Sequence, residues 1–166
     1  VPALFFKRLF DLFVATTVLV LFAPVIVAIA LAIRLDSKGP VFFRQRRVGL
    51  GGRGFMIWKF RSMHIGAEER QKEVFALNAY SDAKLFKMAR DPRITRIGRF
   101  LRRSSLDELP QLLNVILGDM SLVGPRPPLP SEVDNYEPHH FERLTVVPGL
   151  TGPWQVGGRN LVTDFE

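Results

Sequence analysis

The adjacent carboxylates Asp107 and Glu108 are the residues of this sequence with the clearest chemical potential. One carboxylate can attack phosphorus or accept a proton, while its neighbour holds Mg²⁺ against phosphate oxygens. A structural role competes with catalysis, because Ser105 and Glu108 have the spacing of a helix capping box. Pro110 favours a helix that begins nearer Leu109, which leaves both acids in the segment leading into it. Spacing alone favours the capping role over catalysis.

Basic residues gather in two stretches of the chain. Residues 34–61 contain eight basic side chains and one acid, and residues 90–103 contain six arginines and one acid. Near a membrane they would attract anionic lipid and phosphorylated substrates, although a generic polybasic surface accounts for most of them. Lys59 and Arg61 stand apart, because alternation along an expected strand at residues 55–60 places both on one face. These two residues are therefore candidates for lining a pocket.

Proline- and glycine-rich segments late in the chain offer further anion-binding candidates. The turn at residues 124–128 locks Arg126 between prolines, which suits an anion grip, although a plain linker is the alternative. The segments 148–152 and 155–160 supply flexible backbone, amide groups and Arg159. Neither the P-loop lysine motif nor the Rossmann glycine fingerprint occurs in the sequence. These segments indicate phosphate binding only in a general way.

The composition combines apolar character with positive charge. The 166 residues are 47% hydrophobic, with a formal net charge of +7 and a sequence pI near 10.4. A chain of this length predicts one domain. Its composition fits a partner that is both apolar and anionic: a membrane surface, a phosphorylated lipid or nucleic acid. The lack of cysteine excludes disulfides, thiolate metal sites and thiol nucleophiles. Because the chain starts without Met and ends abruptly at Glu166, we expect a fragment of a longer protein.

The segment from Leu12 to Ile33 is uncharged, nearly all apolar and long enough to span a bilayer. Pro24 near its middle removes a backbone hydrogen bond, which kinks or breaks the helix. The two arms would be about 18 and 14 Å long, too short for either to cross alone. Basic residues flank both ends, which favours keeping both on the cytoplasmic side. We therefore expect a re-entrant helix-break-helix; a kinked transmembrane helix is the alternative, since membrane helices tolerate proline.

Shorter elements are expected in the rest of the chain. Residues 41–43 and 55–60 predict two strands around a glycine-rich turn. Residues 66–88 have a helical pattern of mixed charge. In residues 94–103 an apolar stripe is surrounded by arginines, which is typical of an amphipathic helix in the membrane interface. A further apolar helix is expected at residues 109–117.

Six motifs in a fixed order resemble those of the polyprenyl-phosphate phosphoglycosyl transferases, also called bacterial sugar transferases. The motifs lie at residues 7–11 (KRLFD), 39–45 (GPVFFRQ), 59–63 (KFRSM), 106–111 (LDELPQ), 118–127 (GDMSLVGPRP) and 148–152 (PGLTG). The resemblance covers residues 7–160, nearly the whole chain, and the set is highly specific. One departure concerns the membrane break, where the family commonly has Ser-Pro and this chain has Ala23-Pro24. Because a serine hydroxyl would satisfy backbone groups freed by the proline, the bend is expected to be shallower or stabilised otherwise.

The resemblance implies an α+β, mostly helical fold. The protein would be a monotopic membrane protein with a re-entrant helix-break-helix broken at Pro24, interfacial amphipathic helices and a small β-hairpin or sheet. Residues 1–38 would form the re-entrant membrane helix. Residues 39–166 would form the catalytic domain on the cytoplasmic face of the bacterial inner membrane, with the C-terminal part of that domain truncated.

The resemblance also implies an activity. The enzyme would transfer a sugar 1-phosphate from a UDP-sugar to undecaprenyl phosphate and release UMP, the first membrane step in making exopolysaccharide, O-antigen, capsule or another glycoconjugate. The long segment at residues 66–88 resembles members that move galactose or glucose 1-phosphate. Asp107 would be the nucleophile that forms a covalent phosphosugar intermediate, and Glu108 would help bind the required Mg²⁺. The basic residues that match phosphate- or nucleotide-contacting positions are Lys59, Arg61, Arg103, Arg126 and Arg159.

Two other classes of function stay open beside the enzyme. A non-enzymatic basic module would bind any polyanion in a salt-sensitive way, and the paired acids would be dispensable. Nucleic acid is not an expected partner, because the chain has a long apolar segment and few aromatic platforms for bases. The third class is a transmembrane scaffold. Which sugar is moved, and whether the protein forms a homodimer, is left open by the sequence.

Overall fold

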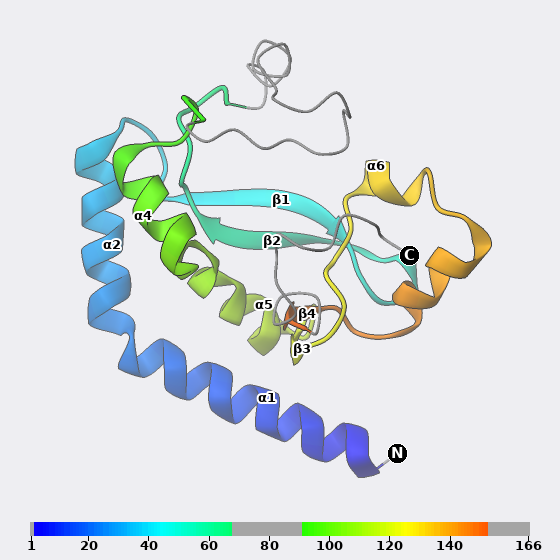
Figure 1. The fold of residues 1–166 in the computed structure, drawn as a ribbon. Helices are drawn as coiled ribbons and strands as arrows, with labels where there is room; N and C mark the ends of the chain where they lie inside the picture. Colours follow the sequence, from blue (N-terminus) through cyan, green and yellow to red (C-terminus); the bar gives the residue numbers. More distant parts are fainter. Residues whose placement is uncertain (1, 68–90, 153–166) are drawn as a thin grey trace. The chain divides into compact units, whose positions relative to one another are not determined.

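The computed structural model describes residues 2–67 and 91–152 (Figure 1). The chain divides into two compact units that alternate along the sequence. The first unit takes Val1–Pro24, Arg44–Lys59 and Glu108–Glu166, and the second takes Val25–Phe43 and Phe60–Asp107. The mostly helical content with a small sheet confirms that part of the predicted fold class, and the monotopic membrane association stays a prediction. A division into membrane and catalytic parts at residue 38 stays a prediction.

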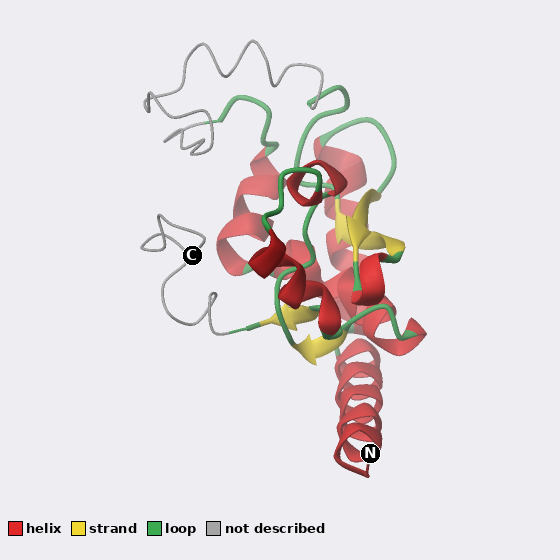
Figure 2. Ribbon diagram, turned by 90° about the vertical axis from the view of Figure 1, so that its right-hand side faces the viewer, coloured by secondary structure: helices red, strands yellow, loops and turns green. Residues whose placement is uncertain are grey.

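Helical segments outnumber strands in the described residues, and the strands form two separate pairs (Figure 2). In chain order the elements are α1 (Pro2–Leu21), α2 (Ala23–Asp36), β1 (Phe42–Val48), the 3-10 helix η1 (Leu50–Gly52), β2 (Gly54–Phe60), α4 (Arg96–Ser104), the 3-10 helix η2 (Leu106–Gln111), α5 (Leu112–Leu117), β3 (Ser121–Val123), α6 (Pro130–Val133), the 3-10 helix η3 (Pro138–Thr145) and β4 (Gly149–Thr151). Strand β1 pairs with β2, and β3 pairs with β4. The short connection between β1 and β2 allows only antiparallel pairing, since parallel strands need a crossover of about a dozen residues.

The apolar N-terminal segment forms the bent helix pair α1 and α2. Helix α1 ends at Leu21 and α2 begins at Ala23, so Pro24 lies in the first turn of α2. A proline there breaks no helical hydrogen bond, because the first N–H groups of a helix have no partner within it. In residues 2–67 and 91–152, no single helix is long and apolar enough to cross a bilayer; α1 and α2 pass that test only together, with a bend of 61°. The predicted helix-break-helix is confirmed, and its place in a membrane stays a prediction.

Polar side chains near the start of α1 bind α5 and β3 of the same unit. Arg8 donates hydrogen bonds to the carbonyl oxygens of Val115 and Ile116, at 2.6 and 2.9 Å. These carbonyls belong to the last turn of α5, where the regular helical partners four residues later are missing; the Val115 oxygen also accepts a hydrogen bond of 3.2 Å from the Gly118 N–H. The buried carboxylate of Asp11 accepts a hydrogen bond of 2.8 Å from the Ser121 hydroxyl in β3. Hydrogen bonds of charged side chains, as well as apolar packing, therefore hold α1 against α5 and β3.

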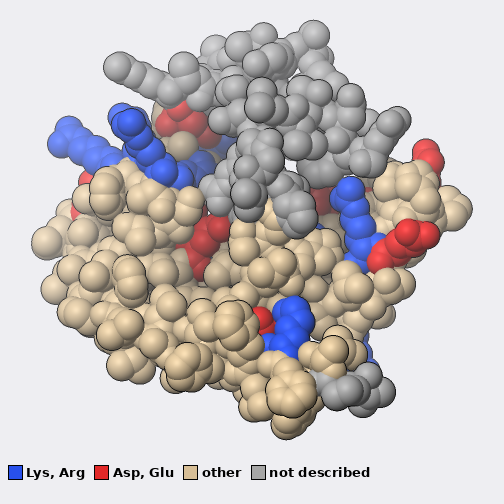
Figure 3. Space-filling model, turned by 60° about the horizontal axis from the view of Figure 1, so that its bottom comes forward, with Lys and Arg blue, Asp and Glu red and all other residues tan. Residues whose placement is uncertain are grey.

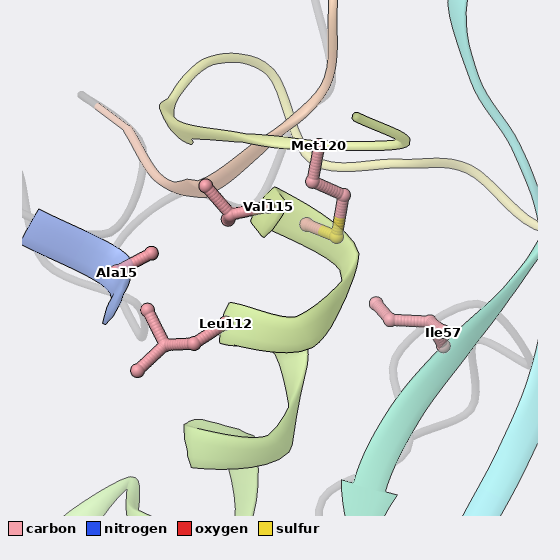
Figure 4. Packing of buried hydrophobic residues seen from close by; sticks show 5 residues of the cluster. All are labelled: Ala15, Ile57, Leu112, Val115 and Met120. Carbon is pink, nitrogen blue, oxygen red and sulfur yellow. The ribbon is translucent and has the colours of Figure 1, made fainter. Parts of the chain in front are cut away.

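The core of the first unit lies where α1, β2 and α5 meet (Figure 4). Leu112 and Val115 of α5 face Ala15 of α1 on one side, and Ile57 of β2 lies on the other. Met120, which follows α5, completes this cluster and is 1% exposed. Burial of apolar side chains of this size stabilises a fold by roughly 1.5–3 kcal/mol for each large residue. Helix α5 is thereby held in the middle of its unit.

Asn114 adds polar contacts that fix α5 against β2. Its side chain is fully buried and accepts a hydrogen bond from the backbone N–H of Trp58 at 3.1 Å. Its amide group donates to the carbonyl oxygen of Met56 at 2.8 Å and to the carboxylate of Asp119 at 3.2 Å. Buried amides are costly unless they are paired in this way. The network therefore specifies one position of α5 along the strand.

Strands β3 and β4 pair in parallel, with Ser121 opposite Gly149 and Val123 opposite Thr151. The backbones approach closely just beyond β3. A Cβ atom built on Gly149 would overlap the backbone of Gly124, and the reverse also holds. This close approach explains why both positions are glycine.

In the second unit, Thr95 and Asp36 cap the start of α4. The Thr95 side chain accepts a hydrogen bond of 2.8 Å from the backbone N–H of Gly98. Asp36, at the end of α2, accepts one of 3.0 Å from the backbone N–H of Ile97. A carboxylate at a helix N-terminus also offsets the positive end of the helix dipole. These contacts set where α4 begins.

The amphipathic helix predicted at residues 94–103 is corrected in two respects. It begins at Arg96, because Ile94 forms an isolated β-bridge with Met63 before the cap. Leu101 of its apolar stripe is buried within the second unit, at 1% exposure, so that side chain does not face a membrane; a place of the helix in the membrane interface stays a prediction. The exposed apolar residue of α4 is Phe100, at 60%.

Other predicted boundaries shift by a few residues. The strand expected at residues 41–43 continues to Val48 as β1. The helix expected at residues 109–117 begins at Leu112, after the 3-10 helix η2. The helix expected at residues 66–88 lies almost wholly outside the described residues.

Candidate active site

A pocket in the first unit contains one of the two candidate acids, and we call it the Glu108 pocket. Its lining comes from β1, β2, η2, the turn after β3 and β4: Arg47, Ile57, Lys59, Glu108, Gln111, Arg126, Pro127, Gly149 and Leu150. All of these residues belong to one compact unit. Three are cationic and one is a carboxylate, so the pocket suits an anionic ligand.

Lys59 and Glu108 form an ion pair in this pocket. The Lys59 ammonium lies 2.9 Å from the Glu108 Oε1 atom. The two side chains are 26% and 23% exposed, so both are still reached by solvent. An ion pair of this exposure contributes little to stability, about 0–1 kcal/mol. The ion pair instead fixes the positions of the two side chains, so that the Lys59 ammonium and the Glu108 carboxylate lie side by side at the pocket wall.

Strand geometry accounts for the position of Arg47. Residues of β1 alternate between exposed and more buried positions, so Arg46 is exposed while Arg47 is 8% exposed. The Arg47 guanidinium donates to the carbonyl oxygen of Pro127 at 3.0 Å and to the Gln45 side-chain oxygen at 2.7 Å. Burial and the charge of Arg126 lower the pKa of Arg47 to about 10, so it remains protonated at neutral pH.

Arg126 reaches the same pocket from the rigid turn that follows β3. Its side chain is 40% exposed, and its guanidinium lies 3.8 Å from the Glu132 carboxylate. Buried Pro127 follows it directly, and its carbonyl is the one that Arg47 binds. The turn predicted to direct Arg126 thus places it at the pocket, and a phosphate-binding role stays a prediction.

The two acids lie in the 3-10 helix η2, which leads into α5 and contains Pro110. Ser105 ends α4 in the left-handed conformation, with φ of 60°. Since α5 begins only at Leu112, the prediction that both acids precede that helix is confirmed. Asp107 is 8% exposed and is the last residue of the second unit, whereas Glu108 is the first residue of the next segment of the first unit.

The remaining sequence candidates lie elsewhere. Arg61 is 6% exposed and does not line the Glu108 pocket. Its guanidinium donates to the carbonyl oxygens of Ser37 and Lys38, at 2.8 and 2.7 Å, just beyond α2. Arg103 lies on the exposed surface of α4. Arg159 lies outside the described residues.

The sequence does not predict two residues of the Glu108 pocket, Arg47 and Gln111. Arg47 was counted only within a basic stretch, because the expected strand stopped at residue 43; strand alternation carried four residues further would have placed it inside. Gln111, 3% exposed, stands three residues after Glu108, and this helical spacing was the available signal.

The donor set can be compared with the needs of Mg²⁺. Among residues 2–67 and 91–152, no three histidine or acid side chains gather as a ready-made metal site. Magnesium in proteins is usually held by one or two carboxylates, with substrate phosphates and water as the other ligands. Consecutive carboxylates at residues 107 and 108 fit that pattern.

Comparison with known proteins gives one consistent result. The family model described as bacterial sugar transferase matches residues 2–166. The galactosyl transferase CpsE of Streptococcus agalactiae is 46% identical over 160 residues, which cover 96% of this chain and 35% of the relative. The undecaprenyl-phosphate galactose phosphotransferase of Salmonella typhimurium is 44% identical, over 98% of this chain and 34% of the relative. A UDP-glucose:undecaprenyl-phosphate glucose-1-phosphate transferase of Caulobacter vibrioides is 46% identical, over 92% and 54%.

The chain spans about a third of the length of the first two of these relatives. The family match nonetheless extends over both compact units and includes every candidate site residue. On this evidence the chain belongs to the bacterial sugar transferase family.

Proposed function

We propose that the protein transfers galactose or glucose 1-phosphate from a UDP-sugar to undecaprenyl phosphate and releases UMP. The observation that carries the proposal is the Glu108 pocket, in which cationic side chains and a carboxylate converge within a family of sugar transferases. The names of the relatives supply the sugars and the lipid acceptor. A diphosphate donor and a phosphate acceptor are both anions, which matches the excess of positive charge in the pocket. Synthesis of exopolysaccharide, O-antigen or capsule is the expected setting.

The proposed chemistry has two steps at one carboxylate. An oxygen of Asp107 attacks the sugar-bearing phosphorus, the bond from that phosphorus to the bridging oxygen breaks, and UMP leaves with the electron pair. A phosphate oxygen of the lipid then attacks the same phosphorus, and the Asp107 carboxylate leaves unchanged. No net proton transfer is needed. Splitting the reaction in this way avoids bringing two polyanions together in a single step.

The pocket residues would bind and orient the substrates. Lys59 and Arg126 are placed to neutralise phosphate oxygens, and Lys59 also holds the Glu108 carboxylate in position. Glu108, with Asp107 beside it in the chain, would hold Mg²⁺. When bound, that ion would neutralise charge on the diphosphate and stabilise the leaving group.

We also propose a monotopic attachment to the cytoplasmic face of the bacterial inner membrane. Helix α1 exposes large apolar side chains, among them Leu4, Phe5 and Phe13 at 73%, 62% and 72%. Helix α2 likewise exposes Val27 and Leu31, at 58% and 60%. Figure 3 shows one face of the molecule, on which uncharged residues cover broad areas between few charged side chains. Apolar surface of this extent marks an interaction site, and the bent helix pair fits a re-entrant insertion.

UMP release by the full-length protein in lipid nanoparticles tests the reaction, with undecaprenyl phosphate, Mg²⁺ and a panel of UDP-sugars. Asp107→Asn should lower the rate at least about 10³-fold, because an amide is a poor nucleophile. Asp134→Asn removes an exposed carboxylate and should leave the rate unchanged. Full activity of Asp107→Asn would eliminate Asp107 as the nucleophile. A basic binding module would instead bind polyanions without releasing UMP.

Cysteine labelling tests the membrane topology, since the sequence contains no cysteine of its own. Single cysteines at Ala3 and Lys38 should react with an impermeant reagent from the same side of the membrane. Labelling from opposite sides would exclude the re-entrant arrangement and favour a transmembrane helix.

A further inference from the structure

Arg47 carries a buried charge that no directly paired carboxylate neutralises in the described part of the chain. It is 8% exposed, and both of its hydrogen-bond acceptors, the Pro127 carbonyl and the Gln45 amide oxygen, are neutral. Within residues 2–67 and 91–152, no carboxylate forms an ion pair with it. A buried charge is costly unless it is paired. Among the described residues the fold therefore maintains a buried cation without an ion-pair partner, with only the more distant charges of Glu108 and Glu132 in its favour.

The surroundings of Arg47 show where a counterion would be placed. Arg47 lines the Glu108 pocket together with Lys59 and Arg126. Glu108 is the acid in that lining, and its Oε1 atom is already bound by Lys59. The pocket thus has an excess of two positive charges, and burial and the repulsion by Arg126 at Arg47 outweigh the attraction by Glu132 and Glu108. An anion entering the pocket would relieve this repulsion and supply the missing negative charge.

The two neutral acceptors also orient the Arg47 side chain. One Nη1–H and one Nη2–H bond hold the guanidinium plane between β1 and the turn after β3. A guanidinium has five N–H donors, so these two bonds leave donors for a ligand. Because the side chain is already fixed, little rotamer entropy is lost when an anion binds.

We propose that Arg47 is a substrate-binding residue whose guanidinium binds phosphate oxygens of the nucleoside diphosphate-sugar in the Glu108 pocket. The proposal rests on the proposed function, because it takes its ligand from that reaction. It assigns Arg47 a role that is distinct from the nucleophile and from the Lys59–Glu108 pair. The neighbouring Arg46, which has the same charge but an exposed side chain, takes no part.

The test measures the affinity of the full-length protein in lipid nanoparticles for uridine diphosphate, by titration calorimetry at several salt concentrations. Arg47→Gln should weaken binding about tenfold or more and reduce its salt dependence, because one charge-assisted contact is lost. Arg47→Lys should recover part of the affinity. Arg46→Gln, which removes the same charge one residue earlier, should bind within about twofold of wild type.

A second variant separates ligand binding from support of the fold. Gln45→Glu places a carboxylate where the Gln45 oxygen now accepts a 2.7 Å hydrogen bond from Arg47. The new ion pair should keep or raise the melting temperature while weakening uridine diphosphate binding about tenfold, because it neutralises the cation. Wild-type affinity in Gln45→Glu, or in Arg47→Gln, would overturn the proposal. If Arg47→Gln and Arg47→Lys lowered the affinity to the same extent, and both also lowered the melting temperature, Arg47 would have a structural role and the proposal would be overturned.

The outcome for the wild-type protein separates this inference from the proposed function. Failure of wild type to bind uridine diphosphate and to release UMP from any UDP-sugar would overturn both. Wild-type binding and turnover, combined with unchanged affinity in Arg47→Gln, would overturn the role of Arg47 alone.

Discussion

Two buried arginines, Arg47 in the Glu108 pocket and Arg61 beyond the end of β2, have similar exposure and different surroundings. Arg61 donates to the carbonyl oxygens of Ser37 and Lys38 and also to the Ser37 hydroxyl, at 2.7–2.9 Å. These acceptors lie at the C-terminal end of α2, where the helix dipole is negative and a cation is favourable. Arg47 instead has two acceptors and belongs to a pocket with two more cations; burial lowers the pKa of both arginines, that of Arg47 to about 10.

The difference separates an arginine that completes the fold from one that is available to a ligand. Burial does not distinguish them, since they are 8% and 6% exposed. What distinguishes them is whether main-chain acceptors already surround the guanidinium. Variants of the two regions should therefore divide into those that change stability and those that change substrate binding.

The largest effect on stability is expected at Arg61. Arg61→Met would leave partly buried carbonyl oxygens just beyond α2 without their donor and should lower the free energy of unfolding by about 1–3 kcal/mol. Thermal or denaturant unfolding in detergent measures this loss. Arg99→Met, an exposed arginine of α4 in the same unit, should change stability by less than about 0.5 kcal/mol. If Arg61→Met kept wild-type stability and lost nucleotide binding, Arg61 would be a ligand-binding residue and its assignment to support of the fold would be wrong.

A variant of Lys59 should change the reaction rate strongly and the stability little, the opposite of Arg61→Met. Lys59→Met removes a cation from the Glu108 pocket and should slow UMP release about 100-fold, because phosphate charge is no longer neutralised. Its stability should fall by less than about 1 kcal/mol, since the ion pair with Glu108 is partly exposed. Arg53→Gln, an exposed basic residue just before β2, is the matched control with an unchanged rate. A loss of stability in Lys59→Met as large as that of Arg61→Met would remove the distinction between the regions.

A smaller, pH-dependent effect should belong to the second unit. Burial raises the pKa of Asp91, but hydrogen bonds from Arg93, with Nη2 2.7 Å from the carboxylate, outweigh it and bring the pKa below its ordinary value of 3.8. The unfolded chain therefore binds the proton more readily, and Asp91 contributes stability above that ordinary value. This contribution should disappear as the pH falls below 3.8 through the lower folded-state pKa. Melting curves of wild type and Asp91→Asn should converge on acidification; a constant difference would contradict the assignment.

Local patterns in the sequence predicted what depends on near neighbours. The break beside Pro24, the strand at residues 55–60 and the position of both acids ahead of α5 follow from proline chemistry and residue alternation. Residues 44–47 are all polar and do not have the hydrophobic pattern of a strand, so the sequence did not predict that β1 continues to Val48 or that Arg47 points inward.

The partners of Arg61 and the start of α4 depend on contacts between segments far apart in the sequence, which local patterns do not predict. Arg61 was grouped with Lys59 by strand alternation, yet its partners lie about 25 residues earlier, beyond α2. The start of α4 shifted because Ile94 pairs with Met63 across a long connection. The chemical role of Asp107 was likewise suggested by the set of motifs around it and not by its own spacing.

The polar contacts of α1 have a consequence for the order of events during synthesis. Arg8 and Asp11 bind partners that lie 107 and 110 residues later in the chain. At roughly 5–20 residues per second, a ribosome needs on the order of 5–20 s to make that stretch. Helix α1 is therefore made well before the partners that hold it, and its apolar side chains are uncovered in the interval. Under the proposed membrane attachment, early contact with lipid would cover these side chains during that interval.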